Sequence, residues 1–259
     1  MEKTMNIKSK LLLALLATSS AAFAQTAPAA PESTIAYNVG VVSEYRYRGL
    51  AQTKGDPALQ GGVDYTDASG FYLGAWGSTI KWIKDSGASA GQTKGPVEID
   101  LYGGYKFEAA GLGFDVGYLR YQYQGNTLKN NTVYTNANTD EVYGAATYGV
   151  TTLKYSYAVS DLFGYTSSKG STYWDLSATL DLGNGYSLVP HAGRQEVKNH
   201  SVNSYTDVAL TLNKDLGDGL SASVAAIRTN RKGDSNFASA LTSYDTAKNA
   251  LVVGVKYSF

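Results

Sequence analysis

Apolar and polar residues alternate with a period of two along most of this chain, and residues 249–259 show the pattern clearly. One set of positions is apolar and aromatic: Leu251, Val253, Val255, Tyr257 and Phe259. The set between them is small or polar: Ala250, Val252, Gly254, Lys256 and Ser258. This alternation predicts a β-strand with one face in an apolar medium and the other in a polar or crowded one.

Twelve segments of this kind follow one another after residue 34. They span about 35–48, 57–67, 70–82, 96–108, 111–124, 140–150, 152–162, 172–182, 185–197, 203–214, 219–230 and 248–259. Most of them are long enough to cross a bilayer as tilted strands, which takes about 9–11 residues.

Short and long connections alternate between these segments. The short ones are rich in Gly, Asn or Asp, which supply the positive φ of tight hairpins: 67–70, 108–111, 150–151, 181–185 and 215–219. The long ones are polar: 49–56, 83–95, 125–139, 163–171, 198–202 and 231–247. A β-sandwich, the competing class, has no reason to alternate in this way. The sequence therefore predicts an all-β, transmembrane, up-and-down antiparallel β-barrel of 12 strands over residues 35–259, with short periplasmic turns and longer external loops.

Aromatic residues near the strand ends predict two girdles at the membrane interfaces. Those beside the short turns are Phe71, Phe107, Phe114, Tyr148 and Tyr186, and those toward the long loops are Tyr45, Tyr47, Tyr123 and Trp174.

Two of the predicted strands do not fit the alternation of lipid-facing and lumenal positions. Trp76, Ile80 and Trp82 fall on a lumenal face, and Arg120 falls on a lipid face. A β-bulge would shift the phase of each strand, and Arg120 at the headgroup level is the alternative.

The first 24 residues have the features of a bacterial secretory signal peptide. Lysines precede a short apolar run over 11–17, and Ala22-Phe23-Ala24 forms a small-x-small cleavage site. The apolar stretch is too short to cross about 30 Å of hydrocarbon as a helix. Residues 25–34 are rich in Ala and Pro, which predicts a flexible periplasmic tail.

Composition narrows the function further. The chain has no cysteine, so thiol chemistry is excluded. The chain has 22 basic and 22 acidic residues, and the signal peptide holds three of the basic ones and one of the acidic ones. The remaining chain therefore has 19 basic and 21 acidic residues, a net charge of −2. It has no excess of basic residues that would indicate binding to nucleic acid. No nucleotide, phosphate-loop or zinc-site motif is present, so we expect no cofactor and no metal. The competing function is a barrel enzyme, either a lipid hydrolase with Ser and His or a protease with Asp and His, for which His191 with Asp175 or Asp207 is a candidate pair. We interpret His191 instead as a polar lumen residue.

The inward face of the strands carries the candidate functional residues. The predicted pore-lining set is Glu44, Arg46, Arg48, Asp64, Glu98, Asp100, Lys106, Asp115, Glu141, Lys154, Asp175, His191, Asp207 and Lys256. Because buried charges must be paired or hydrated, this set indicates a narrow, charged passage for passive diffusion of small solutes or ions. The alternatives are a closed structural or adhesive barrel with a plugged lumen and, more remotely, a barrel enzyme. Arg46 and Arg48 are expected to form either a charged constriction or a brace at the external rim.

Three stretches resemble a known family. They are YNVGVVSEYRYRGLAQTKGDPALQGGVDY over 37–65, SGFYLGAWGS over 69–78 and VEIDLYGGY over 97–105. These stretches resemble the TorF-type family of predicted porins from proteobacteria. The resemblance implies a barrel in the outer membrane of a Gram-negative bacterium, and it implies no substrate.

The aromatic carboxyl terminus suggests how such a barrel is assembled. Tyr257 and Phe259 on the last strand resemble the terminal signal that the outer-membrane assembly machinery recognises. The expected partners are therefore outer-membrane lipid, this machinery and a small solute of unknown identity. An interface between copies of the chain would be apolar and lipid-facing, so the sequence does not predict the oligomeric state.

Overall fold

The computed structural model describes residues 33–86, 94–231 and 245–259. The predicted signal peptide and residues 25–32 of the predicted tail lie outside this part of the chain. The last two residues predicted for the tail belong to the barrel. The Ser33 hydroxyl donates a hydrogen bond to Asp67, and the first strand begins at Thr34.

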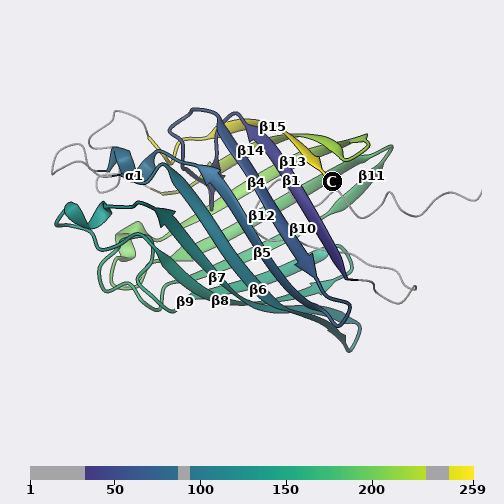
Figure 1. The fold of residues 1–259 in the computed structure, drawn as a ribbon, viewed down its shortest axis with the longest axis horizontal. Coiled ribbons are helices and arrows are strands. Elements are labelled where there is room, and N and C mark those ends of the chain that lie inside the picture. The colour runs from purple at the N-terminus through teal and green to yellow at the C-terminus, as the bar shows by residue number, and fades with distance from the viewer. Residues whose placement is uncertain (1–32, 87–93, 232–244) are drawn as a thin grey trace, which may run out of the picture.

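The strands form a closed antiparallel barrel in which chain neighbours pair with one another and the last strand pairs with the first (Figure 1). The wall consists of β1 (Thr34–Val42), β4 (Ala58–Thr66), β5 (Phe71–Thr79), β6 (Val97–Ala109), β7 (Leu112–Gln124), β8 (Thr139–Tyr148), β9 (Thr151–Ala158), β10 (Thr172–Ala178), β11 (Leu180–Gly183), β12 (Tyr186–Glu196), β13 (Tyr205–Gly217), β14 (Leu220–Thr229) and β15 (Ala250–Ser258). Both β10 and β11 pair with β12, so they are two parts of one crossing strand. The predicted barrel of 12 strands is confirmed.

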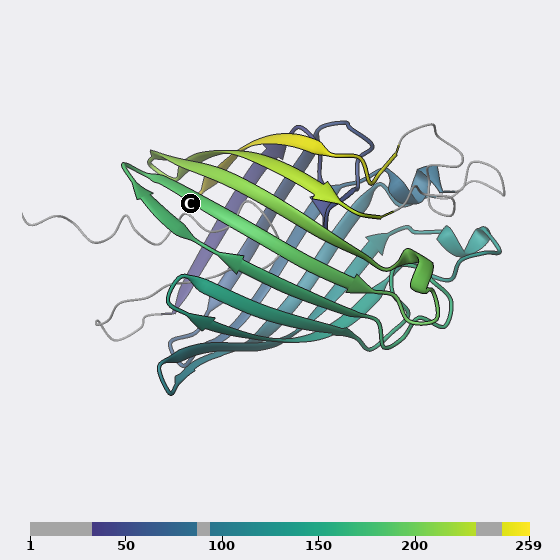
Figure 2. The same cartoon turned by 180° about the vertical axis from the view of Figure 1, so that it is seen from behind.

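The two ends of the barrel differ, as the lengths of the connections predicted. One end, here named the turn end, carries the tight hairpins and both ends of the barrel chain. The turns Asn184-Gly185 and Asp218-Gly219 have positive φ at both residues, which suits two-residue hairpins. The other end, the loop end, carries the long connections with α1 (Trp82–Asp85), η2 (Leu128–Asn130) and η3 (Ser201–Asn203) (Figures 1 and 2). Within the described residues, no helix has the length and apolar character needed to cross a membrane.

The predicted faces of the strands are largely confirmed. Outward side chains such as Leu176, which is 48% exposed, alternate with inward ones such as Asp175, which is buried. The pairing of β5 and of β7 with their neighbours runs without a bulge, so the suggested bulges were wrong. Trp76 does face the lumen, where its ring packs against Tyr45. Arg120 does face outward, where it forms an ion pair with Asp140 at 2.9 Å.

The aromatic girdle predicted at the loop end is mostly wrong, because three of its four residues do not face outward. Trp174 faces outward as predicted, but Tyr45, Tyr47 and Tyr123 lie inside the barrel. Tyr123 packs edge-on against Trp82 of α1, with ring centroids 5.2 Å apart. These rings fill the lumen at this end, because the connections fold inward and supply an apolar surface for them to pack against.

The first predicted strand was too long. It ends at Val42 rather than at residue 48, and residues 43–57, here named the lumenal segment, fold into the barrel before β4 begins. The segment forms its own small hairpin from β2 (Arg46–Tyr47) and β3 (Leu50–Ala51). Glu44, Arg46 and Arg48 are therefore not on the barrel wall, although the sequence placed them there. The alternation in the sequence continues through them because the hairpin also has a period of two.

Candidate functional site

The tip of the lumenal segment is a tight turn that presents Arg48 to the opposite wall. Arg48 and Gly49 both have positive φ, 44° and 77°, which is the conformation of a two-residue hairpin turn. A non-glycine residue in this region is strained by about 1 kcal/mol or more and persists only where its surroundings fix it. The contacts of the Arg48 side chain supply that fixation.

The Arg48 guanidinium is held by three strands that lie across the barrel from β1. Its Nη1 and Nη2 atoms donate to the two carboxylate oxygens of Glu141 on β8, at 3.0 and 2.7 Å. Nη1 also donates to Oε1 of Gln195 on β12 at 2.9 Å. The guanidinium carbon lies 4.2 Å from the ring centroid of Tyr173 on β10 and 5.0 Å from that of Tyr47. This combination of a bidentate carboxylate and aromatic faces is the environment that suits a guanidinium.

The groups that hold Arg48 are themselves oriented by hydrogen bonds. The Tyr121 hydroxyl donates to Oε2 of Glu141 at 3.1 Å. The Gln195 amide donates to the Thr172 carbonyl at 3.0 Å, which directs the Gln195 carbonyl toward Arg48. Because these partners fix the acceptors, the seat of the guanidinium is a built feature of the wall.

The base of the lumenal segment is anchored at several points. The Tyr45 hydroxyl donates to Glu98 on β6 at 3.0 Å, and the Tyr47 and Tyr121 hydroxyls hydrogen-bond to each other. Arg46 pairs with Glu44 at 2.6 Å, and its Nη1 donates to the carbonyl oxygens of Thr246 and Lys248, both at 2.9 Å. The two arginines therefore have separate roles: Arg46 braces the segment at the loop end, and Arg48 links it to the far wall.

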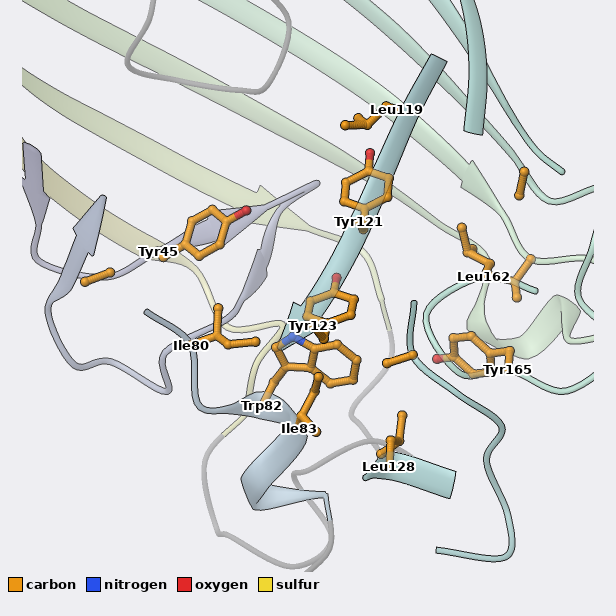
Figure 3. Packing of buried hydrophobic residues seen from close by; sticks show 14 of the residues in the cluster. Tyr45, Ile80, Trp82, Ile83, Leu119, Tyr121, Tyr123, Leu128, Leu162 and Tyr165 are labelled. Carbon is orange, nitrogen blue, oxygen red and sulfur yellow. The ribbon is translucent and has the colours of Figure 1, made fainter. Parts of the chain in front are cut away.

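An apolar cluster fills the loop end of the lumen (Figure 3). It joins inward residues of the wall to residues of the connections: Tyr45, Ile80, Trp82, Ile83, Leu119, Tyr121, Tyr123, Leu128, Leu162 and Tyr165. All of these side chains are buried. Together with the lumenal segment, the cluster fills much of the described part of the loop end, here named the closed half of the lumen.

Besides Glu44, which pairs with Arg46, five carboxylates of the described residues are buried in this half of the lumen: Glu98, Asp100, Glu141, Asp175 and Asp207. Asp100, which is 2% exposed, has an Oδ1 atom with no hydrogen-bond partner. It lies within electrostatic range of Glu98, Glu141 and Arg48. Among the described residues, the basic groups near these carboxylates are Arg48, Lys154 and His191.

His191 lies between two of these carboxylates, as the sequence allowed. Its Nε2 atom is 3.2 Å from Asp175, and its Nδ1 atom is 3.5 Å from Asp207. The Tyr173 hydroxyl donates to Asp207 at 3.1 Å and lies 3.3 Å from Nε2 of His191. In the described residues, His191 forms hydrogen bonds with Tyr173 and Asp175 and with no serine or threonine hydroxyl. The arrangement is a polar network on the wall rather than a nucleophile with its base.

The turn end of the lumen is different, because several of its inward charged side chains are partly exposed. Asp64, Lys106, Asp115 and Lys154 are partly exposed. Two tyrosines orient the acids: Tyr102 donates to Asp64 at 2.5 Å, and Tyr72 donates to Asp115 at 2.6 Å.

The lysines at this level are held by aromatic faces. Lys154 lies 3.9 Å from the Tyr143 ring centroid and Lys106 lies 4.8 Å from that of Tyr72. Lys256 is 4% exposed, and its Nζ atom has no hydrogen-bond partner. No group of three or more His, Asp or Glu side chains in the described residues is arranged to hold a metal ion.

The structure thus separates the predicted set into two groups by depth. Glu44, Arg46, Arg48, Glu98, Asp100, Glu141, Asp175, His191 and Asp207 lie in the closed half or at its boundary, and Asp64, Lys106, Asp115, Lys154 and Lys256 lie toward the turn end. Four residues of the site were not among those predicted from the sequence: Gly49, Tyr121, Tyr173 and Gln195. The inward positions of Tyr121, Tyr173 and Gln195 follow from the alternation, but these residues carry no charge and were not included. Gly49 was assigned to the connection 49–56. The role of these four residues in a pore, like that of the predicted set, stays a prediction.

Residues 25–259 match the Gcw_chp family, which is described as a bacterial protein of unknown function, and the chain belongs to this family. The TorF-type name stays a prediction. No curated relative matches the chain in sequence.

Several solved barrels resemble the structure, including two porins. One is the KdgM porin in complex with disordered oligogalacturonate, with a TM-score of 0.51 and 10% identity over 88% of this chain and 99% of that chain. The other is the NanC porin, with a TM-score of 0.51 and 12% identity over 86% of this chain and 99% of that chain. At these identities the likeness shows a shared fold.

Proposed function

We propose that this protein is a porin-like channel in the outer membrane of a Gram-negative bacterium, through which small solutes or ions diffuse passively. The observation that carries the proposal is a closed barrel, of a fold shared with two porins, whose turn-end lumen carries partly exposed charged and tyrosine side chains. A barrel whose only role was structural would have no need of hydrated charges inside it.

The proposed orientation follows the lengths of the connections. Outer-membrane barrels have short periplasmic turns and longer external loops, so the turn end would face the periplasm. The apolar outer face would contact lipid, and the strand that ends with Tyr257 and Phe259 would be recognised by the assembly machinery. The stretches between residues 37 and 105 that resemble TorF-type proteins support the same assignment.

In the proposed channel, the lumenal segment is the gate. The turn-end half of the lumen carries partly exposed charged side chains, whereas the loop-end half is filled by the segment and the apolar cluster. Solutes would pass when the Arg48 tip leaves the seat formed by Glu141, Gln195 and Tyr173. This movement would leave Glu141 buried without its counter-charge, and leaving one partner of a buried ion pair uncompensated typically costs about 3–5 kcal/mol. The closed conformation would therefore dominate at rest.

The second candidate is a permanently closed structural barrel. The contacts of Arg48 with Glu141, Gln195 and Tyr173 favour this candidate as well. They attach the segment to three wall strands and so brace the barrel across its lumen. We propose no enzymatic role, since the buried His191 network in the described residues offers no serine or threonine hydroxyl as a nucleophile.

Liposome swelling separates the two candidates. The purified protein is reconstituted into vesicles that enclose a large polymer, and the vesicles are diluted into an isosmotic solution of a small sugar. A channel predicts swelling faster than in protein-free vesicles, with a further increase when the Arg48 tip is displaced by Gly49→Ala. Swelling at the protein-free rate for both proteins would leave the closed structural barrel.

A further inference from the structure

The seat of Arg48 contains every element needed to bind a small cation from solution. Glu141 offers both carboxylate oxygens in one plane, Gln195 offers a third acceptor, and Tyr173 offers a ring face. Glu141 and Gln195 are 1% and 2% exposed, and each is oriented by a partner other than Arg48. The seat would therefore keep its shape when Arg48 leaves it.

The charge around the seat also favours a cation. Among the described residues, the groups that oppose the buried carboxylates around the seat are Arg48, Lys154 and His191, which lies between Asp175 and Asp207. Withdrawal of Arg48 therefore removes the cation that pairs with Glu141 and leaves this carboxylate to attract another one. Asp100 has an unpartnered carboxylate oxygen and lies within electrostatic range of both Glu141 and Arg48. A buried acceptor without a partner is unfavourable, and a second donor group on a ligand would satisfy it.

We propose that Arg48 is an internal substitute for the solute, and that the Glu141–Gln195–Tyr173 seat binds a small solute carrying a guanidinium group when the lumenal segment withdraws. The solute and Arg48 then compete for one site, so binding of the solute favours the open conformation. The inference rests on the proposed channel function for its biological meaning, but the binding itself does not require a current.

The geometry selects a guanidinium over a simple ammonium. A planar fork of N–H donors matches the two oxygens of a carboxylate, and its flat face stacks on an aromatic ring. An ammonium ion is a compact and strongly hydrated charge that can make only part of these contacts. An anionic solute would be repelled by the buried carboxylates, and a neutral solute would supply no positive charge to pair with Glu141.

Isothermal titration calorimetry with ethylguanidinium chloride tests the proposal on the detergent-solubilised barrel. Arg48→Ala empties the seat, and we expect it to bind ethylguanidinium at least about tenfold more tightly than wild type, because the seat is then always available and no side chain competes for it. Arg48→Ala combined with Glu141→Gln should lose this gain, and ethylammonium at equal ionic strength should bind Arg48→Ala more weakly than ethylguanidinium. Equal affinity of wild type and Arg48→Ala, or unchanged affinity after Glu141→Gln, would overturn the proposal.

A second variant covers the outcome in which Arg48→Ala does not fold because Glu141 is left buried and unpaired. Gly49→Ala keeps every charge and displaces the tip sterically, so it should also bind ethylguanidinium more tightly than wild type. Liposome swelling measured on the same preparations separates the two proposals. Binding without swelling leaves a cation site in a closed barrel, whereas swelling without binding leaves a channel whose solute is of another class.

Discussion

Gly49 of the lumenal segment lies against Asp207 of β13 so closely that a Cβ atom at residue 49 would be 2.6 Å from the Asp207 Cβ atom. Its φ of 77° is also one that side chains rarely adopt. The tip of the segment can therefore lie against β13 only because residue 49 has no side chain. Glycine allows Arg48, the preceding residue, to reach its seat.

We expect Gly49→Ala to displace the tip. Strain at positive φ costs about 1–3 kcal/mol, and the contact with Asp207 adds to it. Trypsin should then cleave after Arg48 in the folded barrel, whereas wild type should resist cleavage there, as mass spectrometry of the fragments would show. Gly125→Ala is the matched control, because Gly125 also has positive φ but has nothing within 4 Å of its Cβ position. Equal resistance of wild type and Gly49→Ala would contradict the described closure.

The alternating faces of β10 predict a difference between neighbouring substitutions. Leu176 faces outward, where we expect lipid, and Ser177 faces the lumen. Leu176→Arg should lower the free energy of unfolding in a bilayer by about 2–4 kcal/mol, the cost of an arginine near the membrane midplane, while Ser177→Arg should lower it much less. Reversible urea unfolding in lipid vesicles measures both. Equal losses would show that this strand does not face lipid as described.

The last strand ends in an aromatic pair at the turn end, and this pair gives a prediction about assembly. Phe259 stacks on Tyr37 and Tyr257 at the turn end, with centroids 5.6 and 5.5 Å apart. Phe259→Ala removes the ring and keeps the backbone pairing with Tyr37, so we expect less barrel in the outer-membrane fraction of cells with only a small loss of stability. Phe71→Ala is the control, since Phe71 is similarly exposed at the same end. The signal hypothesis fails if both variants insert like wild type.

The turn between β4 and β5 gives a pH-dependent prediction. Hydrogen bonds from the Ser69 hydroxyl and backbone N–H, and from the Tyr65 and Ser33 hydroxyls, lower the pKa of Asp67 to about 2. Since the pKa of an unfolded aspartate is about 3.9, the stability that this carboxylate contributes is present above about pH 4 and is lost as the pH falls through the folded value. The difference in unfolding midpoint between wild type and Asp67→Asn should therefore shrink from pH 5 to pH 2. A constant difference over this range would exclude the mechanism.

The alternation of apolar and polar residues was sufficient to predict the wall of the barrel. It gave the number of strands and most of the inward and outward faces, because a strand has a period of two whatever surrounds it. The pairing of Trp76 with Tyr45 could not be predicted, since the period does not show that the loop end of the lumen is apolar. For this strand a bulge was suggested, whereas Trp76 faces the lumen because Tyr45 packs against it there.

The lumenal segment shows the main limit of the sequence pattern. Tyr45 and Tyr47 alternate with Glu44, Arg46 and Arg48 as in a continuing strand, so the hairpin was taken for part of β1. What distinguishes the inserted hairpin from a continuing wall strand is the contact between Arg48 and Glu141, which lie 93 residues apart in the chain. Such a contact has no local signature. The seat was missed for a related reason, because Gln195 and Tyr173 are neutral and only charged inward residues were counted.

The central claim is that the lumenal segment closes a channel, and one variant tests it most directly. Val42 and Ala58, which flank the segment, are register partners at the last pair of β1 and β4, so a two-residue Asn-Gly turn can replace residues 43–57 and close the same hairpin. Single-channel conductance of this variant and of wild type would be recorded in planar bilayers at equal salt. We predict long closed periods for wild type and a mostly open channel of larger conductance for the variant. Identical recordings from the two proteins, or no current from a variant shown to be folded, would contradict the account.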